Sequence, residues 1–130
     1  MCIFCEIING NIPSSKVYED DDVLAILDLS QTTKGHTLVM PKKHYQNILE
    51  IPQDELANLI IKVQEIAKKV TTNLGAKGFN ILVNTNEVAG QSVMHLHVHI
   101  IPRYDENDTI EIKTYENKFD LSKVLEDINK

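Results

Sequence analysis

The chain is predicted to form an α+β domain: a mostly antiparallel five-stranded sheet, one long helix and short helices near both termini. Two observations predict this class. Apolar and polar residues alternate in several short segments, which is typical of half-buried strands, whereas between Pro52 and Gly75 apolar residues recur every three or four positions, as on an amphipathic helix. The short connections favour antiparallel pairing. A chain of 130 residues has the length of one domain, which we place at 1–130.

The first half of the chain is expected to hold one short helix and three strands. Residues 3–9 predict the helix, which Gly10 would end. Turn residues separate the strand-like segments that follow, among them the acidic run 20–22, Gly35 and Pro41. The expected bounds of the three strands are 16–19, 23–28 and 37–40.

The second half is expected to hold the long helix, two strands and a terminal helix. Pro52 suits the first helical turn, and Gly75 is placed for a left-handed C-terminal cap. Two further strands, at 79–84 and 94–101, are predicted on either side of a loop at 85–91. The tail predicts a short helix with one apolar face, formed by Leu121, Val124, Leu125 and Ile128.

Three of the five histidines lie in the last predicted strand, at every second position. Alternate residues of a strand share one face, so His95, His97 and His99 are expected on one side and Leu96, Val98 and Ile100 in the core. Imidazoles titrate near neutral pH, so such a row indicates a functional site. Spacing alone leaves three explanations open: metal ligands, a nucleophile that attacks phosphorus, or partly buried histidines satisfied by the backbone.

The loop before the histidines favours a phosphate site. Asn84, Gly90, Gln91 and Ser92 offer an amide, a flexible turn and a hydroxyl within a few residues of the histidine row. Backbone N–H groups of a glycine-containing turn, beside a side-chain hydroxyl, can hold phosphate oxygens. The sequence therefore predicts a small phosphorylated ligand close to the histidines.

Composition narrows the range of partners and locations. The formal net charge of −6 argues against a general affinity for nucleic acid or an anionic membrane. No 18-residue apolar run and no signal-like opening occur, so we expect a soluble protein that stays in the cytoplasm. The two cysteines, Cys2 and Cys5, have the spacing of half a zinc site. Two reduced cysteines without a metal are the alternative.

These segments resemble the histidine triad (HIT) family of nucleotide hydrolases and transferases. The resemblance rests on the histidine row with the preceding Gly90–Val93, on the segment from Asp28 to His44, and on the opening Ile3–Ile8. It runs in register from residue 2 to about 104 and leaves a tail at 105–130. The fold it implies is the HIT-like α+β fold.

The resemblance implies a covalent mechanism. His97 would attack the α-phosphorus of a purine nucleotide and form a nucleotidyl-histidine, which water would then hydrolyse to a nucleoside monophosphate. His99 would contact the phosphate, His36 would support the histidines, and Ser92 with the amides near Gly90 and Gln91 would stabilise the phosphate oxygens.

The resemblance also implies a nucleoside site. Asp28 would accept hydrogen bonds from the ribose hydroxyls, and Asn84 would lie at the edge of the phosphate site. Apolar residues would form the slot for the base, although core packing explains each of them equally well. These residues are Ile3, Phe4, Ile7, Ile26 and Leu29.

Some members of the superfamily bind structural zinc, and the matching positions here are Cys2, Cys5, His44 and His95. His95 would then orient His97 rather than react. Members of the family are commonly homodimers, paired through the long helix and a strand edge.

The resemblance leaves the substrate open between nucleoside phosphoramidates, to which Asn84 points, and dinucleoside polyphosphates, to which Pro102-Arg103 points. Two other functions are weighed against these. The chain could be a nucleotide-binding regulator without significant turnover, or a zinc hydrolase that uses the three histidines themselves as ligands.

Overall fold

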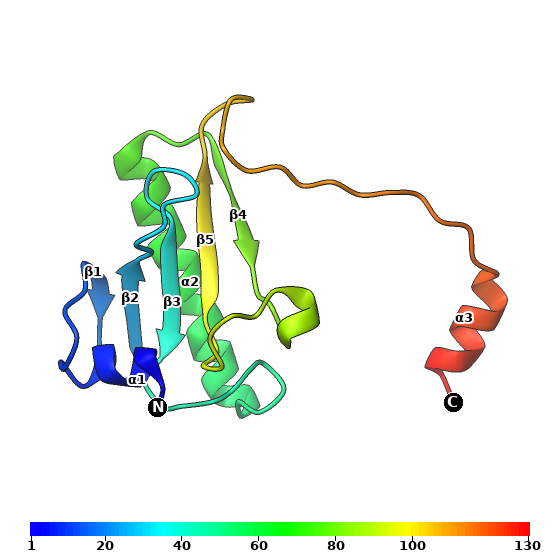
Figure 1. The fold of residues 1–130 in the computed structure, drawn as a ribbon, viewed down its shortest axis with the longest axis horizontal. Helices are drawn as coiled ribbons and strands as arrows, with labels where there is room; N and C mark the ends of the chain where they lie inside the picture. The colour runs from blue at the N-terminus through cyan, green and yellow to red at the C-terminus, as the bar shows by residue number, and fades with distance from the viewer.

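The computed structural model describes residues 1–130 and contains one five-stranded antiparallel sheet with a helix on each face (Figure 1). The sheet order is β1-β2-β3-β5-β4, so β1 and β4 are its two edges. The predicted α+β class and the five-strand count are confirmed. The strands are β1 (Lys16–Glu19), β2 (Val23–Leu27), β3 (Thr37–Pro41), β4 (Gly78–Leu82) and β5 (Val98–Arg103).

The long helix α2 (Gln53–Leu74) covers one face of the sheet. It begins after Pro52 and ends at Gly75, whose φ of 72° gives the left-handed cap that the sequence predicts. Its apolar stripe packs on the residues of β2, β3 and β5 that point the same way. This larger core contains Val23, Ala25, Val39, Leu59, Val63, Ile66, Ala67, Val70, Leu96, Val98 and Ile100.

The short helix α1 (Ile3–Ile8) covers the opposite face of the sheet. Cys2 is its N-cap residue, and its side chain accepts the Cys5 N–H. Phe4 packs there on the alternate residues of the central strands, forming a second core with Leu24, Ile26, Leu38 and Met40. Alternation along β2 and β3 thus separates two apolar layers, as expected for strands buried on both faces.

The histidine strand is shorter than predicted. The sequence predicts a strand from residue 94, but β5 begins at Val98. The chain before it leaves the sheet because the Leu96 N–H donates to the Tyr45 carbonyl at 2.7 Å instead of pairing with β3. The predicted faces are nevertheless correct, since Leu96, Val98 and Ile100 lie in the α2 core and His97 and His99 lie on the α1 side.

Two other boundaries differ from the prediction. β4 ends at Leu82 rather than at residue 84, and the following loop contains a short 3-10 turn at Glu87–Ala89. The predicted tail helix exists as α3 (Leu121–Ile128), but it lies away from the rest of the molecule at the end of an extended segment (Figure 1). None of the helices is both long and apolar enough to span a membrane.

Candidate functional site

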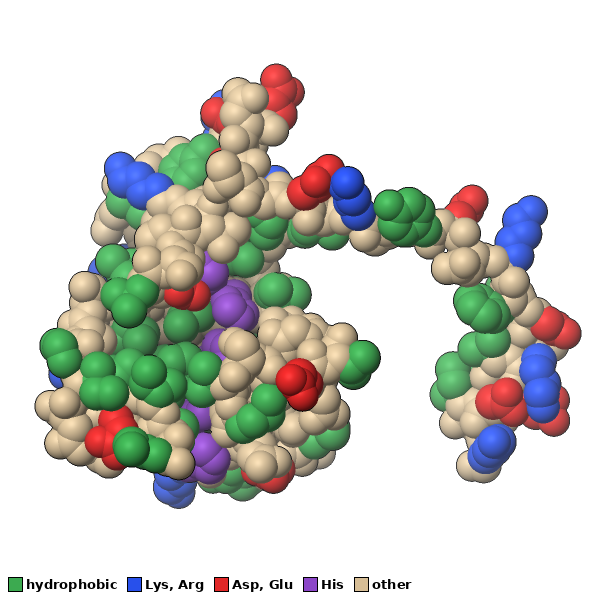
Figure 2. Space-filling view, in the orientation of Figure 1, with side chains coloured by type: hydrophobic (Ala, Val, Ile, Leu, Met, Phe, Trp, Pro, Cys, Tyr) green, Lys and Arg blue, Asp and Glu red, His purple; other side chains and the backbone are tan.

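A hollow of about 240 Å³ lies on the α1 side of the sheet, next to the histidines. Figure 2 shows the histidine side chains in a line across this face, beside a field of hydrophobic side chains. Most of the predicted nucleotide-site residues line the hollow. They are Ile3, Phe4, Ile7, Ile26, Asp28, Leu29, Ser92, His97 and His99, joined by Leu27, Leu38 and Val93, which the sequence did not single out.

Some of the apolar residues that line the hollow are buried in the core, and others are exposed to solvent. Phe4 and Ile26 are buried members of the smaller core, so core packing explains their burial. Ile3 and Leu29 are 50% and 101% exposed, and core packing does not explain them. An apolar wall that is partly open to solvent, with histidines at one end, can accept a flat ring joined to a phosphate.

His97 is held in one tautomer by the backbone. Its Nδ1 lies 2.7 Å from the His95 carbonyl oxygen, which can only accept, so Nδ1 carries the proton. Burial lowers the pKa of His97, opposed by that backbone hydrogen bond and by Asp28, and the ring is neutral at pH 7. The lone pair is therefore on Nε2, where a neutral imidazole is nucleophilic. The edge of Phe4 packs against this ring at a centroid distance of 5.0 Å.

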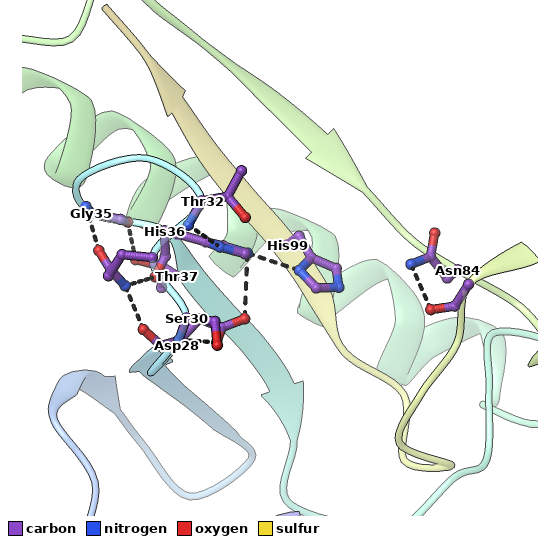
Figure 3. A network of polar contacts seen from close by, with 10 residues as sticks. Asp28, Ser30, Thr32, Gly35, His36, Thr37, Asn84 and His99 are labelled. Carbon is purple, nitrogen blue, oxygen red and sulfur yellow. Dashed lines mark hydrogen bonds and ion pairs between the residues drawn. The ribbon is translucent and has the colours of Figure 1, made fainter. Parts of the chain in front are cut away.

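A chain of hydrogen bonds likewise fixes the tautomer of His99 (Figure 3). The Thr32 N–H donates to His36 Nδ1 at 3.3 Å, so neutral His36 carries its proton on Nε2 and donates it to His99 Nδ1 at 2.9 Å. This leaves the Nε2–H of His99 free to donate to a ligand. Burial, aided by His97 and His36, lowers the pKa of His99 to about 4.

Asp28 lies beside this chain of hydrogen bonds. One carboxylate oxygen accepts the Ser30 N–H at 2.8 Å, and the other lies 3.7 Å from His36 Nε2. Gln31, which the sequence did not single out, braces the same loop, donating to the carbonyls of Asp28 and His36 at 2.6 and 2.8 Å. Nothing in a single sequence distinguishes this glutamine from a surface residue.

The loop before the histidines departs from the prediction at two positions. The N–H groups of Gly90 and Gln91 donate to carbonyls within the loop, those of Glu87 and Asn86, so these amides are not free for phosphate. The Gln91 side chain is buried and bonds to backbone groups, donating to Gln46 and Val93 at 2.5 and 3.1 Å. Glutamine amides satisfy buried backbone groups well, which is a structural role.

The other two residues of this predicted set lie at different distances from the hollow. Asn84 donates to the Gly90 carbonyl at 3.3 Å and does not line the hollow, whereas Ser92 is exposed and does.

A second cluster brings together the four predicted metal ligands. Cys2, Cys5, His44 and His95 each offer one ligand atom, and these atoms all lie within 4.8 Å of one another. His95 donates from Nε2 to the Pro41 carbonyl at 2.8 Å, which leaves its Nδ1 lone pair directed into the cluster. Without a cation, burial and the neighbouring Cys2 thiol raise the pKa of Cys5 to about 11.

The distances within this cluster fit a tetrahedral ion. Bond lengths of about 2.3 Å to sulfur and about 2.0 Å to nitrogen give sulfur–nitrogen edges of roughly 3.5 Å and nitrogen–nitrogen edges of roughly 3.3 Å. The sulfur–nitrogen distances are 3.4 Å for Cys2–His95, 3.4 Å for Cys5–His44 and 3.6 Å for Cys5–His95. The two histidine Nδ1 atoms lie 3.2 Å apart. The four side chains can hold a metal ion.

The three histidines of the row do not converge on one point. His95 faces the cysteines, His97 bonds to the backbone and His99 bonds to His36. This arrangement does not support a metal held by the triad itself. It combines one nucleophilic nitrogen, one free N–H donor and one metal-site ligand.

Comparison with known proteins agrees with this arrangement: residues 9–106 match the HIT domain family. The chain belongs to the HIT family. It is 54% identical over 129 residues to a HIT-like protein of Methanocaldococcus jannaschii, covering 98% of both chains. It is also 44% identical over 102 residues to an adenylylsulfatase of Arabidopsis thaliana, covering 78% of this HIT chain and 52% of that protein.

Solved HIT structures share the fold. A protein from Streptococcus mutans matches with a TM-score of 0.92 at 49% identity, covering 98% of this chain and 83% of that one. A zinc-bound histidine triad family protein from Mycobacterium smegmatis matches with a TM-score of 0.80 at 35% identity, covering 88% of this chain and 84% of that one. The cysteine–histidine cluster is consistent with a zinc-binding branch of the family.

Proposed function

We propose that the protein is a nucleotide hydrolase that cleaves at the α-phosphate through a nucleotidyl-histidine on His97. The observation that carries this proposal is the hydrogen bond from His97 Nδ1 to the His95 carbonyl, because it leaves the opposite nitrogen unprotonated beside the hollow. A protein that only binds nucleotides has no need of a histidine held in this way.

In the first step, the Nε2 lone pair of His97 forms a bond to the α-phosphorus. The bond from phosphorus to the leaving group breaks, and that group departs with the electron pair and takes a proton from water. The product is a cationic nucleotidyl-imidazole. Its Nδ1–H stays bonded to the His95 carbonyl, which stabilises the developing charge. His99 Nε2–H and the Ser92 hydroxyl, which both line the hollow, would donate to the phosphate oxygens.

In the second step, water attacks the phosphorus. The phosphorus–nitrogen bond breaks, its electron pair returns to Nε2, and the water proton passes to solvent. A nucleoside monophosphate leaves. Asp28 would hold the ribose hydroxyls, and the apolar wall around Ile3, Ile7 and Leu29 would hold a purine base. Asn84 would act through the loop that it braces at Gly90.

The leaving group is the least specified part of the substrate. A phosphoramidate, an adenylyl sulfate and a dinucleoside polyphosphate all present the same nucleotidyl group to His97. The adenylylsulfatase relative supports the second of these, adenylyl sulfate. Arg103 does not argue for a dinucleotide, because its side chain bonds to Asp108 and Asn80 at the far end of β5.

The test is AMP release from adenosine 5′-phosphoramidate, adenosine 5′-phosphosulfate and diadenosine tetraphosphate. The protein should release AMP from at least one of them, and a brief quench should trap a chain heavier by one adenylyl group. His97→Ala should lose both signals while still binding AMP. Met94→Ala, in the same segment but outside the hollow, should keep them.

Two other results would each reject this mechanism. If none of the three substrates gives AMP while AMP still binds tightly, the protein is a nucleotide-binding regulator. If His97→Ala keeps its activity and a chelator abolishes it, a metal performs the chemistry.

We propose zinc as the ion of the second cluster. Two thiolates and two imidazoles form a closed tetrahedral set that suits structural zinc, and thiols stay reduced in the cytoplasm, where we place the protein. The zinc-bound relative supports this choice. Zinc would link α1 to the segment before β5 and hold the His95 carbonyl in position. Protein purified without chelator should carry one zinc per chain, and Cys5→Ser should lose it while Glu6→Gln keeps it. A full zinc content in Cys5→Ser would exclude this site.

We further propose that the protein is a homodimer paired at the β4 edge and α2. β4 has no strand on its outer side, and Phe79 and Ile81 are 43% and 47% exposed there. Ile60 and Ile61 of α2 are similarly exposed. An open edge with apolar side chains is a ready pairing surface. Sedimentation equilibrium should give twice the chain mass, and Ile81→Lys should weaken the association.

A further inference from the structure

A second hollow, of about 340 Å³, lies between β1, the loop that joins β2 to β3, and the C-terminal end of α2. We call it the lysine hollow. Apolar side chains from three elements line it: Val17 of β1, Leu27 of β2, and Val70 and Leu74 of α2. Its volume suits a small ligand, since ligand pockets begin at about 300 Å³. None of its lining residues belongs to the metal cluster or to β4, so the zinc site and the dimer proposed above do not use it.

The charged residues of the lysine hollow all have the same sign. Lys34 and Lys69 line it, and none of its 9 lining residues is acidic, although the whole chain has 19 acidic and 13 basic residues. Neither lysine forms an ion pair, and the Lys69 ammonium instead donates to the Val17 carbonyl at 3.0 Å. Both side chains are exposed, and a lysine stem can cover apolar surface while its ammonium stays in water. The hollow therefore combines an apolar interior with a positively charged rim.

One wall of the lysine hollow is formed by the loop that carries Asp28 and His36. Gln31 and Gly35 of this loop line the hollow. The Gln31 side chain donates to the carbonyls of Asp28 and His36 and accepts the Gly35 N–H at 2.7 Å. Leu27 lines both the lysine hollow and the hollow beside the histidines. A ligand in the lysine hollow would therefore contact the residue that braces the nucleotide loop.

We propose that the lysine hollow binds a small carboxylate with an aliphatic chain, and that this ligand favours nucleotide binding. The chain would displace water from the four apolar side chains, and the carboxylate would accept hydrogen bonds from the two ammonium groups at the rim. The hollow has its present shape while Gln31 braces Asp28 and His36, so a ligand that fills it favours that conformation of the loop. The effect on nucleotide binding rests on the proposed function, whereas carboxylate binding does not.

Titration calorimetry of the full chain with octanoate tests the site. Acetate lacks the apolar chain and 1-octanol lacks the charge, so each should bind at least roughly fivefold more weakly than octanoate. In NMR spectra, octanoate should shift the amide signals of Gly35 and Leu74. No saturable binding would overturn the proposal. Shifts confined to Ile3 and Leu29, with displacement of octanoate by AMP, would also overturn it, because they would place octanoate beside the histidines.

A matched pair of variants tests the rim. Replacing both lysines, as Lys34→Gln with Lys69→Gln, should weaken octanoate binding roughly fivefold, to the level of 1-octanol. Lys68→Gln removes a neighbouring exposed lysine that does not line the hollow, and it should weaken binding less than about twofold. Both proteins should bind AMP as the wild type does, because none of these lysines lines the hollow beside the histidines. Equal octanoate affinity in the two proteins would reject the site.

The effect on the nucleotide is measured separately. Saturating octanoate should tighten AMP binding about fivefold, and AMP should tighten octanoate binding by the same factor, because linkage is reciprocal. Gln31→Ala should keep octanoate binding within about twofold and lose this coupling. If octanoate binds in the lysine hollow and the AMP affinity does not change, the carboxylate site stands and the coupling is wrong. If AMP does not bind at all, the proposed function fails, and the octanoate titration still decides the site.

Discussion

The imidazole of His99 connects the site to the stability of the protein. It faces His36, His97 and Asp28, and burial lowers its pKa from the ordinary 6.5 to about 4. The unfolded chain therefore binds a proton at His99 between about pH 6.5 and 4, and the folded chain does not. Stability contributed by neutral His99 is complete above pH 6.5 and is lost as the pH falls toward 4.

This linkage predicts that the wild-type chain and the His99→Asn variant differ in how their stability depends on pH. The free energy of unfolding of the wild-type chain should rise more steeply from pH 4.5 to 7, measured by urea titration, than that of His99→Asn. The asparagine keeps an oxygen that can accept from His36 but does not titrate. The metal cluster titrates equally in both proteins, so the difference isolates His99, and parallel curves would contradict the assignment.

Gln91 provides a second prediction at the scale of one residue. Its side chain donates to the carbonyls of Gln46 and Val93 and accepts the Asn86 N–H at 2.8 Å. Gln91→Met keeps the size but leaves these backbone groups unpaired, which should cost about 1–3 kcal/mol of unfolding free energy. Gln46→Ala, which removes an exposed side chain and keeps the bonded carbonyl, should cost less than about 0.5 kcal/mol. Urea unfolding measures both, and equal costs would reject the role of Gln91.

Among the elements, the loop between β2 and β3 decides where His36 lies. Gly35 has a φ of 92°, and a Cβ there would collide with Leu74 Cδ1 at the end of α2. Gly75 also has a positive φ, of 72°, but its Cβ position is open. Gly35 is therefore limited both by backbone conformation and by space.

We expect Gly35→Ala to destabilise the protein by about 1–3 kcal/mol and Gly75→Ala by about 1 kcal/mol. The first carries a steric cost on top of the backbone cost that both share. Thermal and urea unfolding of the two variants would test the order. If Gly75→Ala were less stable than Gly35→Ala, the Leu74 side chain would be able to move away from a Cβ at residue 35 at little cost.

For the whole molecule, the hollow joins α1, the end of β2 and the chain around His97, three segments far apart in sequence. A ligand there binds only the folded chain and should stabilise it. Free AMP at 100 times its dissociation constant should add about 2.7 kcal/mol to the free energy of unfolding. Adenosine at the same concentration should add less, because it lacks the phosphate that His99 and Ser92 would hold. Equal effects of the two would place the phosphate outside the histidine site.

Much of the fold, and the face on which each of its side chains lies, could be predicted from the sequence alone. Alternation and helical periodicity gave five strands and the long helix, because a side chain's face depends on its spacing along the chain. The same periodicity put Leu96, Val98 and Ile100 in the core and His97 and His99 opposite them. The resemblance to the HIT family supplied the four metal-ligand positions, which the structure brings together.

Only the tertiary structure decided which atoms meet. Cys2 and His95 are 93 residues apart. The hydrogen bond from the Leu96 N–H to the Tyr45 carbonyl, which keeps the residues before Val98 out of β5, joins two loops. The hydrogen bond from Gln91 to the Gln46 carbonyl and the one between His36 and His99 likewise depend on partners far away in the sequence. A hydrogen bond requires a particular neighbour in space, and periodicity specifies only which way a residue faces.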